Sequence, residues 1–275
     1  MRAAAERRIK LNYAVDHWRG DFRAMASPCE VLIRTPERRQ AHNITAMVAE
    51  EAWRIEDKFS RYLAGNIVDR INTSDGAAID VDDETANLLG FADSLYTMSE
   101  GRFDITSGAL RHAWTFDGSD NLPSRAKIAR ALNHVGWHRV QWEPPRLKLL
   151  PEMQIDFGGI AKEYAVDRAA TLIRSQHDDS CLINFGGDLM TVGPETGGGW
   201  RVGIEKTEPD TDSPERVIRI SHGALATSGD ARRYLSKDGV RYGHVLDCST
   251  GWPVVDAPRS TTVAADTCTQ AGMLA

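Results

Sequence analysis

Two glycine pairs each follow an apolar segment of the kind that forms a buried strand. In Gln154–Asp167 (QIDFGGIAKEYAVD) the pair is Gly158 and Gly159, and an amphipathic helical pattern begins directly after it. The free N–H groups and the positive dipole end of a helix's first turn favour a bound phosphate. Lys162 could add positive charge, and Leu182–Leu189 (LINFGGDL) repeats the strand and glycine pair. Both pairs indicate a polar ligand such as a phosphate, with two ordinary strand-end turns as the alternative.

One histidine stands in a setting that suits proton transfer. His244 and Asp247 lie three residues apart in segment 242–254 (YGHVLDCSTGWPV), which begins at the end of a predicted hairpin strand and is rich in turn residues. An imidazole titrates near neutral pH and can take a proton from a hydroxyl. A lone histidine is more often structural, and the other seven of the eight histidines have no such setting.

A third segment, 101–106 (GRFDIT), places an aromatic ring, Phe103, beside a carboxylate, Asp104. It follows a predicted helix end, so it suits either a ligand-binding loop or a packed ring next to a helix-capping aspartate. The patterns G-x-G-x-x-G and G-x-x-x-x-G-K-[ST] do not occur in the chain, which excludes ordinary Rossmann and P-loop sites.

Hydrophobic periodicity predicts the elements that position these groups. Apolar residues spaced by three or four predict one long helix, with these positions on its buried face: Ala41, Ile44, Val48, Ala52, Ile55 and Phe59. Three more helices are predicted, from near Asp82 to before Gly101, over Ser124–Asn133, and from Ile160 to about Ser175. The predicted strands are Cys29–Arg34, Arg139–Trp142, Arg146–Leu150, Gln154–Phe157, Cys181–Phe185, Asp188–Val192, Trp200–Glu205, Arg216–Ser221, Ala224–Ser228, a hairpin turning at Asp238-Gly239, and Thr261–Ala265. Gly197–Gly199 and Thr207–Pro214 are predicted loops.

Composition limits the class of protein. With 41% hydrophobic and 26% charged residues, the 275-residue chain can bury a full core, and we expect one domain of mixed α/β (α+β) class with an extensive, largely antiparallel sheet flanked by helices. The net charge of −6 argues against nucleic acid as a partner, and no apolar run is long enough to span a membrane. Four cysteines without a CxxC pattern are expected to be reduced structural thiols. The N-terminal residues lack the apolar stretch of a signal peptide, which favours the cytoplasm for the chain as written.

Taken in order, these segments resemble one family, the ApbE-type FAD:protein FMN transferases. The resemblance covers residues 22–275, after a polar N-terminal arm over residues 1–21. Its blocks are RAMASPCEVLI from Arg23, FSRY at Phe59–Tyr62, Asn66–Asn72, GRFDIT, DFGGIAKEYAVD, NFGGDL, ATSGDARRY, HVLDCSTGWPV and STTVAAD. It implies an ApbE-like domain that cleaves the pyrophosphate of FAD, attaches FMN to a threonine or serine hydroxyl of an acceptor flavoprotein, and releases AMP. Mg²⁺ on the pyrophosphate suits such phosphoryl transfer.

The resemblance also assigns residues. His244 matches the family histidine that takes the proton of the acceptor hydroxyl, and Ala161 matches the residue whose backbone carbonyl is a metal ligand. The positions that match FAD-contacting residues of the family are Met25, Tyr62, Arg102, Phe103, Asp104, Gly158, Tyr164 and Leu246.

Three positions depart from the family pattern. The final strand of the family is followed by A-D-x-x-x-T, whose Asp and Thr help to bind Mg²⁺; here the Asp position is Gly272, and the Thr would follow Ala275. Glu163 stands where the family usually has glycine, and Cys248 where proline is common. Glycine has no side-chain oxygen, so the departures leave two alternatives open: an FAD-binding protein without transfer activity, and a Mg²⁺-dependent FAD pyrophosphatase that uses water. The family also includes members that act outside the cytoplasm, so loss of an N-terminal signal would imply a periplasmic location.

Overall fold

The computed structural model describes residues 7–195, 197–204, 216–229 and 234–275. Its contacts divide the chain into two compact units, each described by itself below. Unit 1 comprises residues 1–57, 160–228 and 260–275, and unit 2 comprises residues 58–159 and 229–259. The predicted loop Thr207–Pro214 lies outside the described residues.

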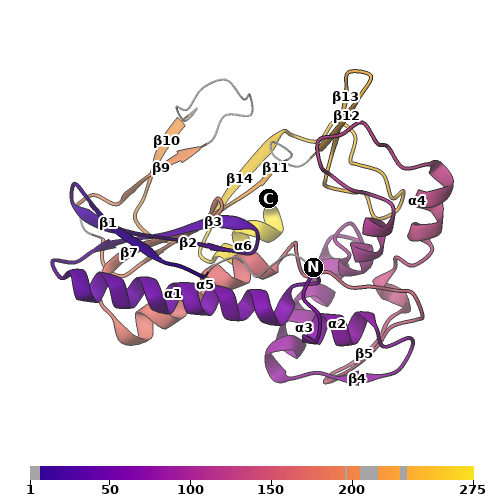
Figure 1. Cartoon of the computed structure of the whole chain (residues 1–275), viewed down its shortest axis with the longest axis horizontal. Coiled ribbons are helices and arrows are strands. Elements are labelled where there is room, and N and C mark those ends of the chain that lie inside the picture. The colour runs from indigo at the N-terminus through magenta and orange to yellow at the C-terminus, as the bar shows by residue number, and fades with distance from the viewer. Residues whose placement is uncertain (1–6, 196, 205–215, 230–233) are drawn as a thin grey trace. The chain divides into compact units, whose positions relative to one another are not determined.

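Unit 1 is built on a seven-stranded sheet with the order β1-β2-β3-β7-β8-β11-β14 (Figure 1). Neighbouring strands from β1 to β11 pair in the antiparallel sense. The strands are β1 Lys10–Ala14, β2 His17–Ala24, β3 Ser27–Arg34, β7 Ser180–Phe185, β8 Asp188–Val192, β11 Ala224–Gly229 and β14 Ser260–Ala265. This confirms the predicted fold class and the large antiparallel sheet.

Helices and a hairpin cover the two faces of this sheet. Helix α1 (Arg38–Phe59) packs against β2 so closely that a Cβ on Gly20 would lie 2.2 Å from Thr45 Oγ1, which explains the glycine. Helix α5 (Ala161–Gln176) packs against β7 and β8, and α6 (Cys268–Leu274) packs against α5 and β14. On the other face, a hairpin of β9 (Trp200–Ile204) and β10 (Arg216–Ile220) packs over an apolar cluster that includes Leu182 and Leu225 of the sheet. The buried positions predicted for the long helix are all confirmed.

Unit 2 contains more helix than strand and carries two small sheets. Its elements are α2 Ile67–Asn72, α3 Asp83–Met98, α4 Arg125–Leu132, the 3₁₀ helices η1 Ile105–His112 and η2 Trp137–Arg139, the three-stranded sheet of β4 Ile79–Asp80, β6 Arg146–Lys148 and β5 Gln141–Glu143, and the hairpin of β12 Tyr234–Lys237 and β13 Val240–Gly243. As predicted, α3 starts after the capping residue Asp82 and its end is followed by Gly101 with a positive φ of 80°.

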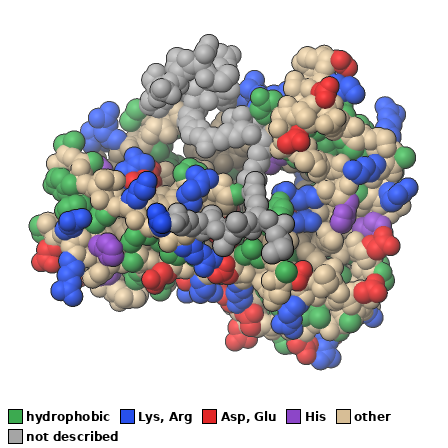
Figure 2. All heavy atoms as spheres, in the orientation of Figure 1, with side chains coloured by type: hydrophobic (Ala, Val, Ile, Leu, Met, Phe, Trp, Pro, Cys, Tyr) green, Lys and Arg blue, Asp and Glu red, His purple; other side chains and the backbone are tan. Residues whose placement is uncertain are grey.

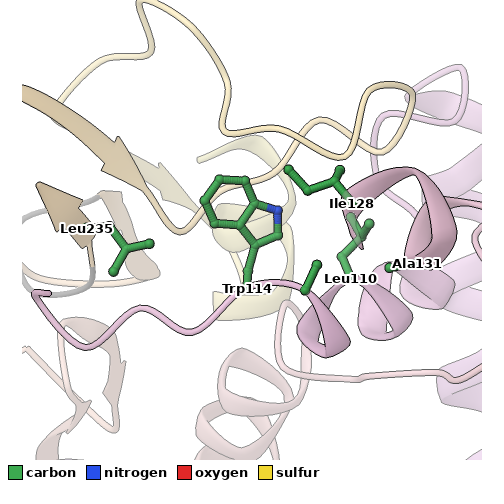
Figure 3. Close-up of a cluster of buried hydrophobic side chains, with 6 residues drawn as sticks. Leu110, Trp114, Ile128, Ala131 and Leu235 are labelled. Atoms are coloured by element: carbon green, nitrogen blue, oxygen red, sulfur yellow. The ribbon is translucent and has the colours of Figure 1, made fainter. Parts of the chain in front are cut away.

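An apolar cluster in unit 2 holds the hairpin to η1 and α4. Trp114 stands at its centre, with Leu110, Ile128, Ala131 and Leu235 around it (Figure 3). Trp114 Nε1 donates a 2.8 Å hydrogen bond to the carbonyl oxygen of Gly251, so the buried indole also holds the loop that follows β13. The loop that this bond holds is the one that begins at His244.

Several predicted elements differ from the structure. Segment Gln154–Phe157 joins no sheet, because Asn72 exchanges side-chain hydrogen bonds with the backbone of Ile155 and the carbonyl of Ile105 accepts from Asp156 N. The predicted strand Arg139–Trp142 begins only at Gln141, because Arg139 closes η2. Residues 10–21, predicted to be part of a polar arm, form β1 and most of β2. Helices α2 and α6 and the 3₁₀ helix η1 were not predicted.

Over the described residues, no helix is both long and apolar enough to cross a membrane. All four cysteines are free, and Cys29, Cys181 and Cys268 are buried. On the face drawn in Figure 2, acidic and basic side chains are interspersed.

Candidate active site

The segment GRFDIT forms the rigid start of η1 in unit 2. Asp104 is 5% exposed, and its carboxylate accepts hydrogen bonds from Thr106 N at 2.7 Å and from Trp137 N at 2.9 Å. The ring of Phe103 lies over Gly159, where an added Cβ would come within 3.1 Å of Phe103 Cε2. A side chain at the second glycine of the pair would therefore crowd this ring. Asp104 is a helix cap and the ring is packed on the glycine turn, as the second reading of the segment predicts, and the ligand-binding reading stays a prediction.

A charged network joins the first glycine of the pair to Tyr62. Asp156 Oδ1 accepts from Gly158 N at 2.8 Å, and Asp156 Oδ2 lies 3.4 Å from Arg61 Nη1 and 3.2 Å from Arg111 Nε. Arg111 in turn donates to the hydroxyl of Tyr62, whose side chain is exposed. Sequence reasoning missed Asp156, Arg61 and Arg111. The carboxylate of Asp156, two residues before Gly158, was the available signal.

His244 follows directly after β13, at the edge of the cluster around Trp114. Its ring is partly buried and meets the ring of Phe116 edge to face, with centroids 6.4 Å apart. Leu246 packs against the same cluster. Asp247 Oδ1 accepts from the backbone N–H and the hydroxyl of Ser249, and these bonds lower the pKa of Asp247. The structure thus places Asp247 in the turn, as a local cap.

The loop that carries His244 lies against the start of η1. Cys248 lies close enough to the Ser107 side chain and the Asp104 backbone for both to lower the pKa of its thiol, while burial, the larger effect, raises that pKa to about 11. Cys248, the departure from the proline of the family pattern, is therefore a packing contact between two loops. Unit 2 brings the predicted residues Asp104 and Leu246 onto adjoining loops.

In unit 1, Met25 occupies the tight turn between β2 and β3. Ala24 pairs with Ser27, and both turn residues have left-handed backbone conformations, with φ of 50° at Met25 and 58° at Ala26. The backbone N–H of Met25 donates to the carboxylate of Glu56 on α1. Non-glycine residues in this region cost roughly 1–2 kcal/mol each, so the turn stores strain at a predicted site residue.

The first turn of α5 carries Ala161, Lys162, Glu163 and Tyr164. Ile160 precedes Ala161 as the cap residue and offers no capping side chain. Lys162 Nζ lies 2.8 Å from Asp188 Oδ2, so its charge is engaged inside unit 1 by the aspartate of the second glycine segment. Burial, and then the nearby Asp188, raise the pKa of Glu163 to about 7. The interactions of Asp188 with Lys162 and Glu163 were not predicted, although Asp188 directly follows the second glycine pair.

Asp167, one turn further along α5, fixes helix α6. Its carboxylate accepts from Cys268 N at 2.8 Å and from Thr269 N at 2.9 Å, which satisfies two free donors in the first turn of α6. Glu163 precedes Asp167 by four residues and therefore lies on the same side of α5. The aspartate thereby sets the position of Gly272 relative to Glu163.

We expect Asp167→Ala to lower the free energy of unfolding by about 1–2 kcal/mol, because two helix-end donors lose their acceptor. Urea unfolding of the variant would measure this. Asp178→Ala, at an exposed position after α5, is the matched control and should change stability by less than about 0.5 kcal/mol. A loss no larger than that of the control would show that α6 docks without this cap.

No group of three or more His, Cys, Asp or Glu side chains suited to a metal ion occurs among the described residues. A surface depression of unit 2 is lined by Arg125, Ile128, Ala129, Leu132, Thr250 and Trp252, none of which is a predicted site residue.

The ApbE family profile matches residues 25–275, which is most of the chain. The chain belongs to the ApbE family. It is 31% identical over 227 residues to a Vibrio cholerae FAD:protein FMN transferase, a match that covers 80% of this chain and 68% of the relative. The match to a Haemophilus influenzae FAD:protein FMN transferase is 28% identical and covers 78% of this chain and 65% of that protein. The chain thus spans about two thirds of the length of these relatives.

Solved structures show the same fold. The crystal structure of an ApbE protein from Thermotoga maritima superposes with a TM-score of 0.85 at 32% identity, covering 94% of this chain and 84% of that one. The flavin transferase ApbE from Vibrio cholerae superposes with a TM-score of 0.81 at 26% identity, covering 98% of this chain and 86% of that one.

Proposed function

We propose that this chain is an FAD:protein FMN transferase, with residues 22–275 as its catalytic domain. The observation that carries the proposal is the packing in unit 2, where the loop of His244 contacts the start of η1 through Cys248. That contact joins two blocks of the ApbE pattern that are far apart in sequence. The names of the relatives support the same reaction, with FAD as substrate and a protein as acceptor.

In the proposed reaction the hydroxyl oxygen of an acceptor threonine or serine attacks the phosphorus on the FMN side of the FAD pyrophosphate. A new P–O ester bond forms, the bond from that phosphorus to the bridging oxygen breaks, and AMP leaves with that oxygen. His244 takes the proton of the attacking hydroxyl. The residues proposed to contact FAD are Met25, Tyr62, Arg102, Phe103, Asp104, Gly158, Tyr164 and Leu246.

The residues present in unit 1 fit a divalent cation. Glu163 Oε2 is buried and accepts no hydrogen bond from the described residues, so a carboxylate oxygen, the donor that Mg²⁺ prefers, is available on the first turn of α5. The backbone carbonyl of Ala161 is proposed as a second ligand. When bound, Mg²⁺ neutralises charge on the pyrophosphate.

We expect FAD to bind at least about tenfold more tightly than FMN, a difference of about 1.4 kcal/mol, because the proposed site holds a pyrophosphate and an adenosine as well as the flavin. Calorimetric titration of the full chain with FAD, FMN and NAD would measure this. Equal affinity for FAD and FMN would contradict a site that holds the pyrophosphate.

The reaction itself is tested with an acceptor domain that bears a target threonine or serine. Incubation with FAD and Mg²⁺ should release AMP and raise the acceptor's mass by one FMN residue, and both should require the acceptor. AMP release without acceptor would instead indicate a pyrophosphatase that uses water. Bound FAD with no AMP under either condition would indicate an FAD-binding protein without transfer activity.

A further inference from the structure

A cluster of buried charge in unit 1 is short of one positive charge. Asp188 is 1% exposed, and it is paired with Lys162 at 2.8 Å and accepts from Thr227 N at 3.3 Å. Both of its carboxylate oxygens therefore have a partner. Glu163 is close enough to this pair for Asp188 to perturb it, so the cluster holds two carboxylates and one ammonium.

Glu163 is the member of the cluster without a counter-charge of its own. Its Oε2 is inaccessible to water and has no hydrogen-bond donor among the described residues. A buried carboxylate oxygen without a donor is costly, because its hydration has been lost and nothing replaces it. A cation at this oxygen would remove the cost.

The same side chain occupies the space next to Gly272 on α6. A Cβ added at Gly272 would lie 2.6 Å from Glu163 Cγ and 3.1 Å from both Glu163 Cδ and Oε1. Contacts this short exclude a side chain at position 272 while Glu163 keeps its conformation. Conversely, the carboxyl carbon and Oε1 of Glu163 lie 3.1 Å from the place where the Cβ of an aspartate at position 272 would stand.

We propose that Glu163 supplies the carboxylate ligand for the divalent cation in this chain, from α5, in place of a side-chain oxygen on α6. The proposal rests on the proposed function for the identity of the cation and for the nearby pyrophosphate. It accounts for two departures from the family pattern with one contact: Glu163 replaces a glycine and Gly272 replaces an aspartate, so the carboxylate has moved between adjacent helices.

The test uses the full chain, saturating FAD and no acceptor, with Mn²⁺ as the probe and free Mn²⁺ measured by electron paramagnetic resonance. Glu163→Gln keeps the shape of the side chain and removes its charge. We expect its Mn²⁺ dissociation constant to rise at least about tenfold. Glu50→Gln, on the exposed side of α1, is the matched control and should leave the constant unchanged. A Glu163→Gln value within about twofold of wild type, or a wild type that binds no Mn²⁺, overturns the proposal.

A paired exchange provides the second arm. The double variant Glu163→Gly, Gly272→Asp returns the carboxylate to α6 and opens the space it needs, so we expect Mn²⁺ binding to recover to within a few-fold of wild type. Gly272→Asp alone should lower the thermal unfolding midpoint, because the new side chain collides with Glu163. A folded double variant that binds Mn²⁺ no better than Glu163→Gln overturns the proposal.

The outcomes separate this inference from the proposed function. Wild-type chain that modifies the acceptor, combined with unchanged Mn²⁺ binding in Glu163→Gln, overturns the role of Glu163 and leaves the transferase reaction in place. Weakened Mn²⁺ binding in Glu163→Gln, combined with no FMN transfer by the wild type, supports the ligand and contradicts the transferase.

Discussion

His244→Asn should lower the rate of FMN transfer by roughly 10²–10⁴, while the dissociation constant for FAD changes by no more than a few-fold. The asparagine amide is similar in size to an imidazole but cannot take a proton from the acceptor hydroxyl. His244 lies at the edge of its apolar cluster, partly buried against Phe116, so the substitution leaves the buried side chains around Trp114 in place. The rate would be measured as the appearance of flavinylated acceptor at saturating FAD.

Two further measurements decide what a loss of rate means. His222→Asn, at an exposed position in unit 1, is the matched control and should transfer FMN at the wild-type rate. Unchanged transfer by His244→Asn would leave the histidine a structural residue. If FAD binding and the thermal unfolding midpoint fall together with the rate, His244 holds the site in shape and another group takes the proton.

Periodicity predicted the elements whose burial is one-sided. The long helix α1 and strand β3 were read correctly because their apolar residues recur at the spacing of one buried face. The same reasoning failed at Gln154–Phe157, where alternating residues suggested a strand. The partners there are the side chain of Asn72 and the carbonyl of Ile105 at the start of η1, and no local pattern encodes a hydrogen-bond partner 83 residues away.

For the candidate site, the sequence predicted the motif residues but not the side chains that contact them. Motif residues such as Phe103, Gly158 and His244 could be named from the sequence, because their types and order match the family. Their neighbours could not, since Asp156 meets Arg61 and Arg111 only after distant segments pack together. Glu163 and Gly272 were each visible as a departure from the family pattern. Only the structure shows that the side chain of Glu163 occupies the space beside Gly272.

Lys162→Met should lower the free energy of unfolding by about 3 kcal/mol at pH 8, because it leaves the buried carboxylate of Asp188 without its counter-ion. Burial already raises the pKa of Asp188, and Lys162 is the main group that lowers it again. Without the lysine this pKa rises further above its value in the unfolded chain. A raised carboxyl pKa costs stability when the group is ionised, so the loss should be largest at high pH and should shrink as the pH falls and Asp188 takes up a proton.

Urea unfolding from pH 5 to pH 8 would measure both the size of this loss and its direction with pH. Lys127→Met, at an exposed position on α4, controls for the removal of a positive charge and should stay within about 0.5 kcal/mol of wild type. The double variant Lys162→Met, Asp188→Asn removes both charges and should recover at least about half of the loss, because a neutral amide costs less to bury than a carboxylate. A loss that is the same at pH 5 and pH 8, and that the second substitution does not reduce, would mean that the lysine stabilises unit 1 by packing its aliphatic stem. The ammonium group of Lys162 would then be available to bind a phosphate, which is the role that the sequence predicts for it.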